Sequence, residues 1–164
     1  MEAVVLDVNV PIVANGQHDR AELLCIRACI RALRESRGQV VLVDAGQRIL
    51  AKYRDYLSGS GQPGPGDAWF KWLWQNQANR RRCRQVQVKS IGGSDTDFEE
   101  YPADPDLAKF DPADRVFVAV AVASGLDANI LNATDTDWWP VRQAFERNDV
   151  KIVFLCEELM TGKD

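Results

Sequence analysis

The sequence predicts an α/β fold in three layers, in which a central parallel sheet of about five strands carries helices on both faces. Short apolar runs alternate along the chain with longer segments of helical spacing, and this alternation is typical of parallel sheets with helical crossovers. The first runs are apolar throughout, as expected of strands covered on both faces. The predicted strands are residues 3–6, 40–43, 86–88, 129–131 and 151–155.

Length and composition predict one domain that spans residues 1–164. A chain of 164 residues has the usual size of a single domain, and 46% hydrophobic residues can build a core. The net charge of −4 excludes overall attraction to nucleic acid, so such binding needs a local basic patch. The N-terminus does not resemble a secretory signal, and no run approaches the about 20 apolar residues of a membrane span. We therefore expect a cytoplasmic protein that makes no contact with membranes.

The predicted helices are defined by capping residues and apolar spacing. Asp19 is a suitable N-cap for the first helix and Asp67 for the helix that contains the Trp-rich segment. Asp111 is a suitable N-cap before Pro112, which fits the first helical position. The segments 19–36 and 47–57 each carry apolar side chains on one side, as amphipathic helices do. Besides the helix that starts at Asp67, the predicted helices span residues 19–36, 47–57, 112–124 and 139–147.

Carboxylates stand at the ends of elements that should lie side by side. Asp7 and Asp44 directly follow predicted strands. Asp135 and Asp137 come soon after the predicted strand 129–131, and Asp114 lies in the first turn of a predicted helix. Each has a structural alternative, as a cap or a turn residue. Because parallel strands end at the same edge of a sheet, where ligands bind, these acids are expected to converge. Several carboxylates in one cleft need cations to stay ionised, and their oxygens suit Mg²⁺ or Mn²⁺.

The chemistry that fits such a site is hydrolysis of a phosphodiester. A divalent ion can activate water and stabilise the charge that develops on phosphate. The chain has no glycine-rich phosphate loop with Lys, which argues against hydrolysis of nucleoside triphosphates. It also lacks the G-x-S-x-G motif and has one histidine, His18, in a polar loop, which argues against a Ser-His triad.

Three segments together resemble the PIN domain family of metal-dependent nucleases. They are "VVLDVNVPIVANG", "FDPADRVFVAVAVASG" and "NILNATDTDWW", which occur in the family's order over nearly the whole chain. The resemblance implies single-stranded RNA cleavage at an acidic cleft holding Mg²⁺ or Mn²⁺, commonly by bacterial toxins that pair with an antitoxin protein; nucleases of this type often form homodimers. It implies Asp7, Asp114, Asp135 and Asp137 as catalytic residues, the first three as metal ligands, with Asn9, Asp44 and Thr134 in support.

Lys52 departs from the family pattern, since "RILAKYRDY" has Lys at a place where the family usually carries Glu. Three explanations stay open. Asp44, or else Asp55 or Asp67, supplies the missing oxygen; the remaining acids suffice for one metal; or the chain is a catalytically weak module that binds RNA or a protein. A phosphatase of the haloacid dehalogenase type also opens with a strand and Asp, but it needs a second Asp where this chain has Asn9.

Basic and aromatic side chains offer candidate contacts to RNA. The basic run Arg80, Arg81, Arg82 and Arg84 either contacts phosphates or is a solvated helix end. Trp69, Trp72 and Trp74 either stack on bases or, as their spacing favours, place two rings toward the core and one in solvent. The acidic segment 94–106 is expected to be an irregular solvated loop, with a mimic of nucleic acid or a shield of the cleft as alternatives.

The four cysteines are predicted to be small buried hydrophobic residues. None forms a C-x-x-C pair, and Cys25 and Cys29 stand one helical turn apart. A zinc site would need further ligands in a spacing that the sequence does not offer.

Overall fold

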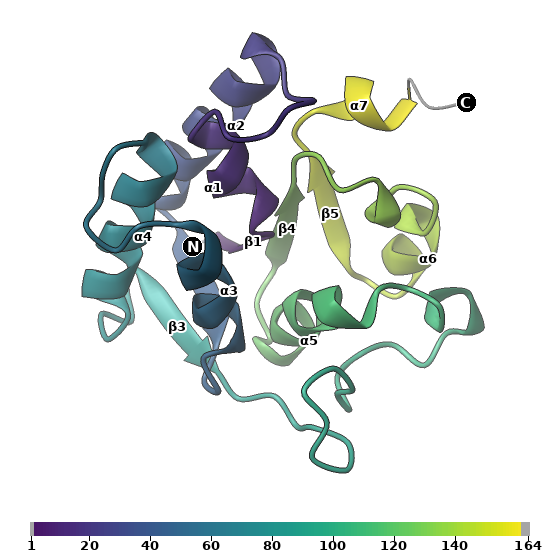
Figure 1. The fold of residues 1–164 in the computed structure, drawn as a ribbon. Helices are drawn as coiled ribbons and strands as arrows, with labels where there is room; N and C mark the ends of the chain where they lie inside the picture. The colour runs from purple at the N-terminus through teal and green to yellow at the C-terminus, as the bar shows by residue number, and fades with distance from the viewer. Residues whose placement is uncertain (1, 162–164) are drawn as a thin grey trace.

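The structure of the chain, a computed structural model, describes residues 2–161 and has the predicted three-layer α/β/α architecture (Figure 1). All five strands are parallel, in the order β3-β2-β1-β4-β5. Strand order therefore reverses between β1 and β4, which lie side by side at the centre. The strands are β1 (Ala3–Leu6), β2 (Val40–Asp44), β3 (Cys83–Val86), β4 (Ala128–Asn132) and β5 (Lys151–Phe154).

Helices cover both faces of this sheet. Helices α1, α2 and α4 pack on one another on one face of the sheet, and α5 and α6 lie on the other face (Figure 1). Helix α3 contacts both β2 and α5. No helix within residues 2–161 is long and apolar enough to cross a membrane. The helices are α1 (Asn9–Ala14), α2 (Leu23–Ser36), α3 (Arg48–Tyr56), α4 (Pro65–Asn76), α5 (Arg115–Ala123), α6 (Arg142–Arg147) and α7 (Glu157–Thr161).

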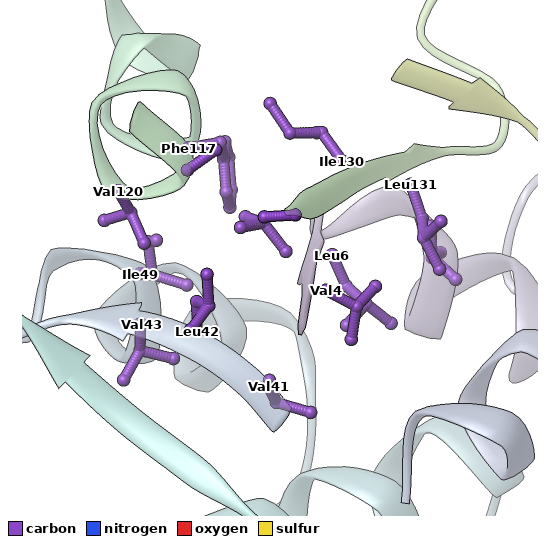
Figure 2. Close-up of a cluster of buried hydrophobic side chains, with 14 of the residues drawn as sticks. Val4, Leu6, Val41, Leu42, Val43, Ile49, Phe117, Val120, Ile130 and Leu131 are labelled. Carbon is purple, nitrogen blue, oxygen red and sulfur yellow. The ribbon is translucent and has the colours of Figure 1, made fainter. Parts of the chain in front are cut away.

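The core lies on both sides of the central strands. Every residue of β1 and β2 is buried, which explains why these strands are apolar throughout. Figure 2 shows Leu42 and Val43 of β2 near Ile49 of α3 and Val120 of α5, with Phe117 close to Ile130. This packing fixes α3 and α5 against the C-terminal part of the sheet.

Several predicted boundaries are wrong by a few residues. Helix α2 begins at Leu23 after an irregular loop, so Asp19 does not cap it. Helix α4 begins at Pro65, and Asp67 is its third residue, whose carboxylate accepts hydrogen bonds from the amides of Gly64 and Ser58. The third strand is Cys83–Val86 rather than 86–88. Asp111 caps a 3₁₀ turn, Pro112–Asp114, from which α5 continues.

Two short helices were not predicted, and one predicted helix is shorter. Helices α1 and α7 have six and five residues, too few to show a periodic apolar pattern. The helix predicted over 139–147 comprises only Arg142–Arg147, preceded by a 3₁₀ turn at Thr136–Trp138.

The acidic segment 94–106 is irregular, as predicted, apart from a 3₁₀ turn at Pro105–Leu107. Arginines from elsewhere in the chain bind it. Arg48 pairs with Asp95, Arg115 with Asp97, and Arg147 with both Asp104 and Asp106. These arginines are therefore already occupied within the protein.

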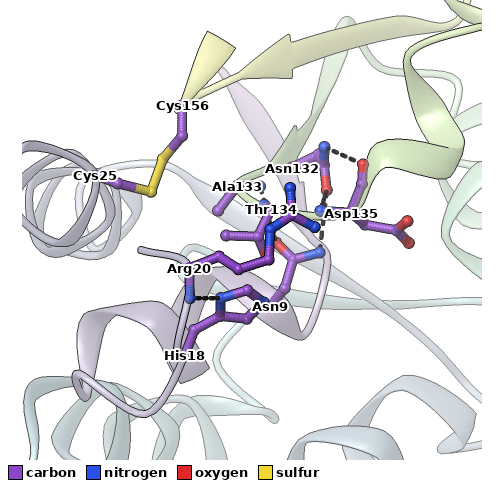
Figure 3. Close-up of a disulfide and its surroundings, with 9 residues drawn as sticks. All are labelled: Asn9, His18, Arg20, Cys25, Asn132, Ala133, Thr134, Asp135 and Cys156. Carbon is purple, nitrogen blue, oxygen red and sulfur yellow. Dashed lines mark hydrogen bonds between the residues drawn. A yellow bond between two sulfur atoms is a disulfide. The ribbon is translucent and has the colours of Figure 1, made fainter. Parts of the chain in front are cut away.

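The prediction that all four cysteines are separate buried residues is wrong for one pair. Cys25 of α2 and Cys156, which follows β5, form a disulfide (Figure 3), while Cys29 and Cys83 are buried free thiols. The paired residues stand 131 positions apart in the sequence, so only the packing of α2 beside the end of β5 brings them together.

Loss of this disulfide should destabilise the protein. A cross-link over 131 residues restricts the unfolded chain strongly, so the Cys25→Ala/Cys156→Ala variant should lose about 4 kcal/mol of unfolding free energy. Guanidinium denaturation with and without a reductant measures this loss. The reductant should shift the wild-type unfolding midpoint to a lower guanidinium concentration and leave the midpoint of the variant unchanged. Equal wild-type midpoints with and without the reductant would show that the disulfide does not contribute to stability.

Candidate metal centre

Three of the predicted carboxylates converge at the C-terminal edge of the sheet. Asp7 follows β1, Asp135 lies beyond β4, and Asp114 ends the turn that leads into α5. One oxygen from each of the three lies within 4.8 Å of the others. They meet where strand order reverses, the place at which open α/β sheets bind ligands.

Asp7 is buried and held on both carboxylate oxygens. The indole Nε1 of Trp138 donates to its Oδ2 at 3.0 Å, and the backbone amide of Asn9 donates to Oδ1 at 3.3 Å. The Trp138 ring is itself fixed by edge-to-face contact with Phe110, at 4.7 Å between ring centroids, and by Phe145. The aromatic core therefore orients Asp7.

Two asparagines connect the loops that carry Asp7 and Asp135 (Figure 3). Asn9 donates from Nδ2 to Oδ1 of Asn132 at 3.0 Å, and its Oδ1 accepts from the amide of Ala133 at 2.8 Å. Asn132 donates to the carbonyl of Asp135 at 2.9 Å and accepts from the amide of Asp135 at 3.2 Å. Asn9 thus links the segment that follows Asp7 to the segment that carries Asp135, and Asn132 is a second linking residue that the sequence did not reveal.

The electrostatics of the centre reflect crowded negative charge. Burial, followed by the charge of Asp135, raises the pKa of Asp7 to about 7. Burial, then the charges of Asp7 and Asp135 and a hydrogen bond to Asp135, raises the pKa of Asp114 to about 8. A divalent cation among these oxygens would relieve the repulsion.

The other predicted site residues lie near the centre or have structural contacts. The side chain of Asp137 is exposed; its amide donates to Oδ1 of Asp135 at 2.9 Å, and the charge of Asp135 raises its pKa. Thr134 is buried, and its amide donates weakly to Asn9 at 3.4 Å. Asp44 accepts hydrogen bonds from the amides of Arg48 and Ile49, so it caps α3 and is not among the three converging carboxylates.

Asp55 and Asp67 also lie outside the group of three acids. Asp55 is exposed on α3, and Asp67 is used in capping α4. Neither of them, nor Asp44, joins the convergent oxygens in the part of the chain that the structure describes.

Lys52 lies on the side of α3 that is next to the centre. The hydroxyl of its neighbour Tyr53 donates to the carbonyl of Leu6, the residue before Asp7. The Lys52 ammonium lies 5.8 Å from the ring centroid of Phe117, one turn after Asp114 in α5. Its charge lowers the pKa of Asp7, although less than burial and Asp135 raise it.

The basic run lies at the other edge of the sheet. Arg80, Arg81 and Arg82 precede β3, and Arg84 is its second residue, so these residues stand where the parallel strands begin. Of the three tryptophans, Trp69 is buried, Trp72 is partly buried against the core and Trp74 is exposed. His18 lies in the loop between α1 and α2, and its Nδ1 accepts from the amide of Arg20.

A hollow of about 560 Å³ adjoins the centre. Asp111, Thr136 and Asp137, which are near neighbours of the converging acids, line one part of it, and Lys109 and Trp139 line another. The centre is therefore next to open space that could admit part of a substrate.

The donor set fits a hard divalent cation. Three carboxylates from separate elements supply oxygen ligands, which Mg²⁺ and Mn²⁺ prefer. Burial first, and then the charges of the facing acids, raise the pKa values of Asp7 and Asp114, and a cation would offset both effects.

The burial of these acids, together with their mutual repulsion, predicts a pH-dependent loss of stability in EDTA. Unfolded, both carboxyls ionise near their ordinary pKa of 3.8, whereas folded they keep protons to about pH 7 and pH 8. Between pH 3.8 and about pH 8, the folded state therefore binds more protons than the unfolded state. The unfolding free energy falls as the pH rises through this range. Asp114→Asn should escape much of this loss and exceed wild type above pH 8 by on the order of 2 kcal/mol.

Thermal melts across pH in EDTA measure this difference. Asp55→Asn, an exposed substitution on α3, is the control and should follow wild type. If the stability difference between wild type and Asp114→Asn is the same at pH 4 and above pH 8, the pKa values of these carboxyls are not raised by burial and repulsion.

Comparison with known proteins assigns no family to the chain. No protein-family model, no curated protein and no solved structure matches it.

Proposed function

We propose that the protein is a Mg²⁺- or Mn²⁺-dependent endoribonuclease that cleaves single-stranded RNA. The observation that carries the proposal is the convergence of Asp7, Asp114 and Asp135 oxygens within 4.8 Å at the reversal of strand order. These three residues would hold the ion. When bound, the ion would supply Lewis-acid activation of water and stabilisation of the phosphodiester.

The residues around the ligands support this chemistry by fixing them. Trp138 and the Asn9 amide hold both oxygens of Asp7, while Asn132 holds the backbone of Asp135. Asp137 is exposed at the mouth of the adjoining hollow, where it can accept a proton or orient water. Preorganised ligands of this kind keep their positions during reaction without further rearrangement.

We propose RNA as the substrate because the chain resembles the PIN domain family. The same resemblance suggests a toxin that pairs with an antitoxin protein, and a homodimer. The proposed cytoplasmic location rests instead on the sequence, in which neither a secretory signal nor a membrane span is recognised. Disulfides are rare in the cytoplasm, so there we expect the Cys25–Cys156 pair to exist mainly as thiols.

Loss of a ligand carboxylate should abolish cleavage with little effect on the fold. Asp7→Asn and Asp114→Asn each remove one charged ligand but keep a side chain of the same shape, so cleavage should fall at least about 100-fold. The assay follows a labelled single-stranded RNA in Mn²⁺, with circular dichroism as the test of folding. Asp55→Asn is the control and should cleave normally. Full activity in EDTA, or in both ligand variants, would refute the proposal.

A second candidate is a catalytically weak module that binds RNA or a protein, and Lys52 is the observation that favours it. Its ammonium lies beside the centre and acts on Asp7, where it would also repel a divalent cation. The two candidates differ in whether the wild-type centre binds a metal.

Replacement of Lys52 by Glu should strengthen metal binding. The change removes a cation and adds a carboxylate near Asp7, so Mn²⁺ affinity measured by calorimetry should rise at least about tenfold. Lys52→Met is the matched control, which removes the charge without adding a ligand and should give a smaller gain. If only Lys52→Glu binds Mn²⁺ and cleaves RNA, the wild-type protein is the catalytically weak module. If both variants bind Mn²⁺ with the wild-type affinity, Lys52 does not act on the metal centre.

A further inference from the structure

A row of arginines lies along the outer face of α2. Arg27, Arg31 and Arg34 recur at each turn of the helix, and Arg37 follows its end; all four are exposed. Arg82, which precedes β3, joins the row because its guanidinium donates to the carbonyl of Arg37 at 2.6 Å. We call these five residues the arginine strip. It is a concentrated positive region on a protein whose net charge is −4.

The arginine strip has no acidic partner within the protein. Among residues 2–161, no carboxylate forms an ion pair with any of its five members. In contrast, Arg48, Arg115 and Arg147 all pair with the acidic segment 94–106. The chain therefore neutralises some of its arginines but leaves those of the strip available to an external anion.

The surface along the strip is hollowed and has an aromatic side chain at one end. Arg27, Arg31 and Arg34 border a hollow of about 320 Å³ with Ile30. A second hollow of about 280 Å³ shares Ile30 and Arg34 and continues to Arg37 and the start of α4. The Arg37 guanidinium lies 5.5 Å from the ring centroid of the partly exposed Trp72.

The strip starts at the end of the sheet that carries the metal centre. The Cys25–Cys156 disulfide attaches the first turn of α2 to the end of β5, at the C-terminal edge. From there α2 runs to the opposite edge, because β2 begins at Val40, shortly after the helix ends. Figure 1 shows α2 on the same side of the sheet as α1 and α4.

We propose that the arginine strip is a second nucleic-acid surface, which binds the phosphates of single-stranded RNA outside the cleavage site. Arg27 and Arg31 are separated by about 6 Å along the helix axis, so successive turns present cations at regular intervals to a regular polyanion. The planar guanidinium groups of the arginines also suit stacking on unpaired bases. The identity of the ligand as RNA rests on the proposed function, whereas the surface itself is defined by charge and shape.

The test measures RNA binding without cleavage. Wild type and the Arg27→Gln/Arg31→Gln/Arg34→Gln variant are titrated into a labelled oligouridylate in EDTA at several salt concentrations. Gln keeps a similar helix propensity, so α2 should remain folded, which circular dichroism checks. The triple variant should bind at least about tenfold more weakly at low salt, and the slope of log affinity against log salt should decrease in magnitude by about 2, or roughly 0.7 for each lost phosphate contact.

A matched control removes the same number of charges elsewhere. Among the residues described, Arg54, Lys71 and Lys89 are exposed, form no ion pair and lie outside the strip, so their replacement by Gln should leave the salt slope nearly unchanged. An equal loss in both triple variants would overturn the proposal. So would tighter binding of a polyglutamate peptide than of RNA, which would indicate an acidic protein as the partner.

A second readout separates the strip from the proposed nuclease activity. In Mn²⁺, the strip variant should lose kcat/KM on a long RNA through a higher KM but cleave a dinucleotide like wild type. If wild type does not cleave RNA in Mn²⁺ while strip-dependent binding in EDTA persists, the nuclease proposal fails and the strip stands. If cleavage is normal and the strip variant binds long RNA like wild type, the strip proposal fails alone.

Discussion

The reversal of strand order between β1 and β4 is the constraint on which the rest of the structure depends. These strands pair in parallel, and the ladder continues one residue further, where the amide of Asp7 donates to the carbonyl of Leu131 at 3.0 Å. Their crossover connections leave toward opposite sides of the sheet, so no connection covers the end of this pair. Asp7 and Asp135 follow the two strands into that opening, and α5, which returns the chain to β4, places Asp114 beside them. One topological feature thus collects three acids from distant parts of the chain.

Bringing these acids together opposes folding, and the surrounding residues offset the cost only in part. Hydrogen bonds from Trp138 and the Asn9 amide stabilise the ionised form of Asp7, but burial and Asp135 outweigh them and raise its pKa. Lys52 acts in the same direction as those hydrogen bonds. A chain selected for stability alone would avoid such a cluster, whereas functional sites commonly retain unfavourable local electrostatics. This local penalty supports the proposed metal site over the alternative that the acids are three unrelated caps.

The sequence was informative wherever the signal was local. Apolar strands, the Asp111-Pro112 helix start and the positions of the acids at element ends could all be read from neighbouring residues, and together they predict the fold and the convergence. Asp19 misled because its suitability as a cap says nothing about the loop that intervenes before α2 begins at Leu23. Asn132 was missed because its role comes from a contact with Asn9, 123 residues away. The Cys25–Cys156 bond escaped detection for the same reason, since neither residue has a local pattern that names its partner.

Charge segregation explains how an acidic protein could attract RNA to an acidic cleft. Over long distances the net charge of −4 opposes the approach of a polyanion. At physiological ionic strength, however, exposed charges are screened beyond about 8 Å, so the arginine strip and the acidic centre act as separate local fields. Phosphates held on α2 would raise the local concentration of RNA near the end of the helix that carries Cys25. Only the RNA segment that enters the metal centre would then need a divalent cation to lie among the carboxylates. Binding would then rely on the arginine strip, and cleavage on the acidic centre. Because Arg48, Arg115 and Arg147 pair with the acidic segment, they are less available to phosphates than the arginines of the strip, which form no ion pair among the residues described.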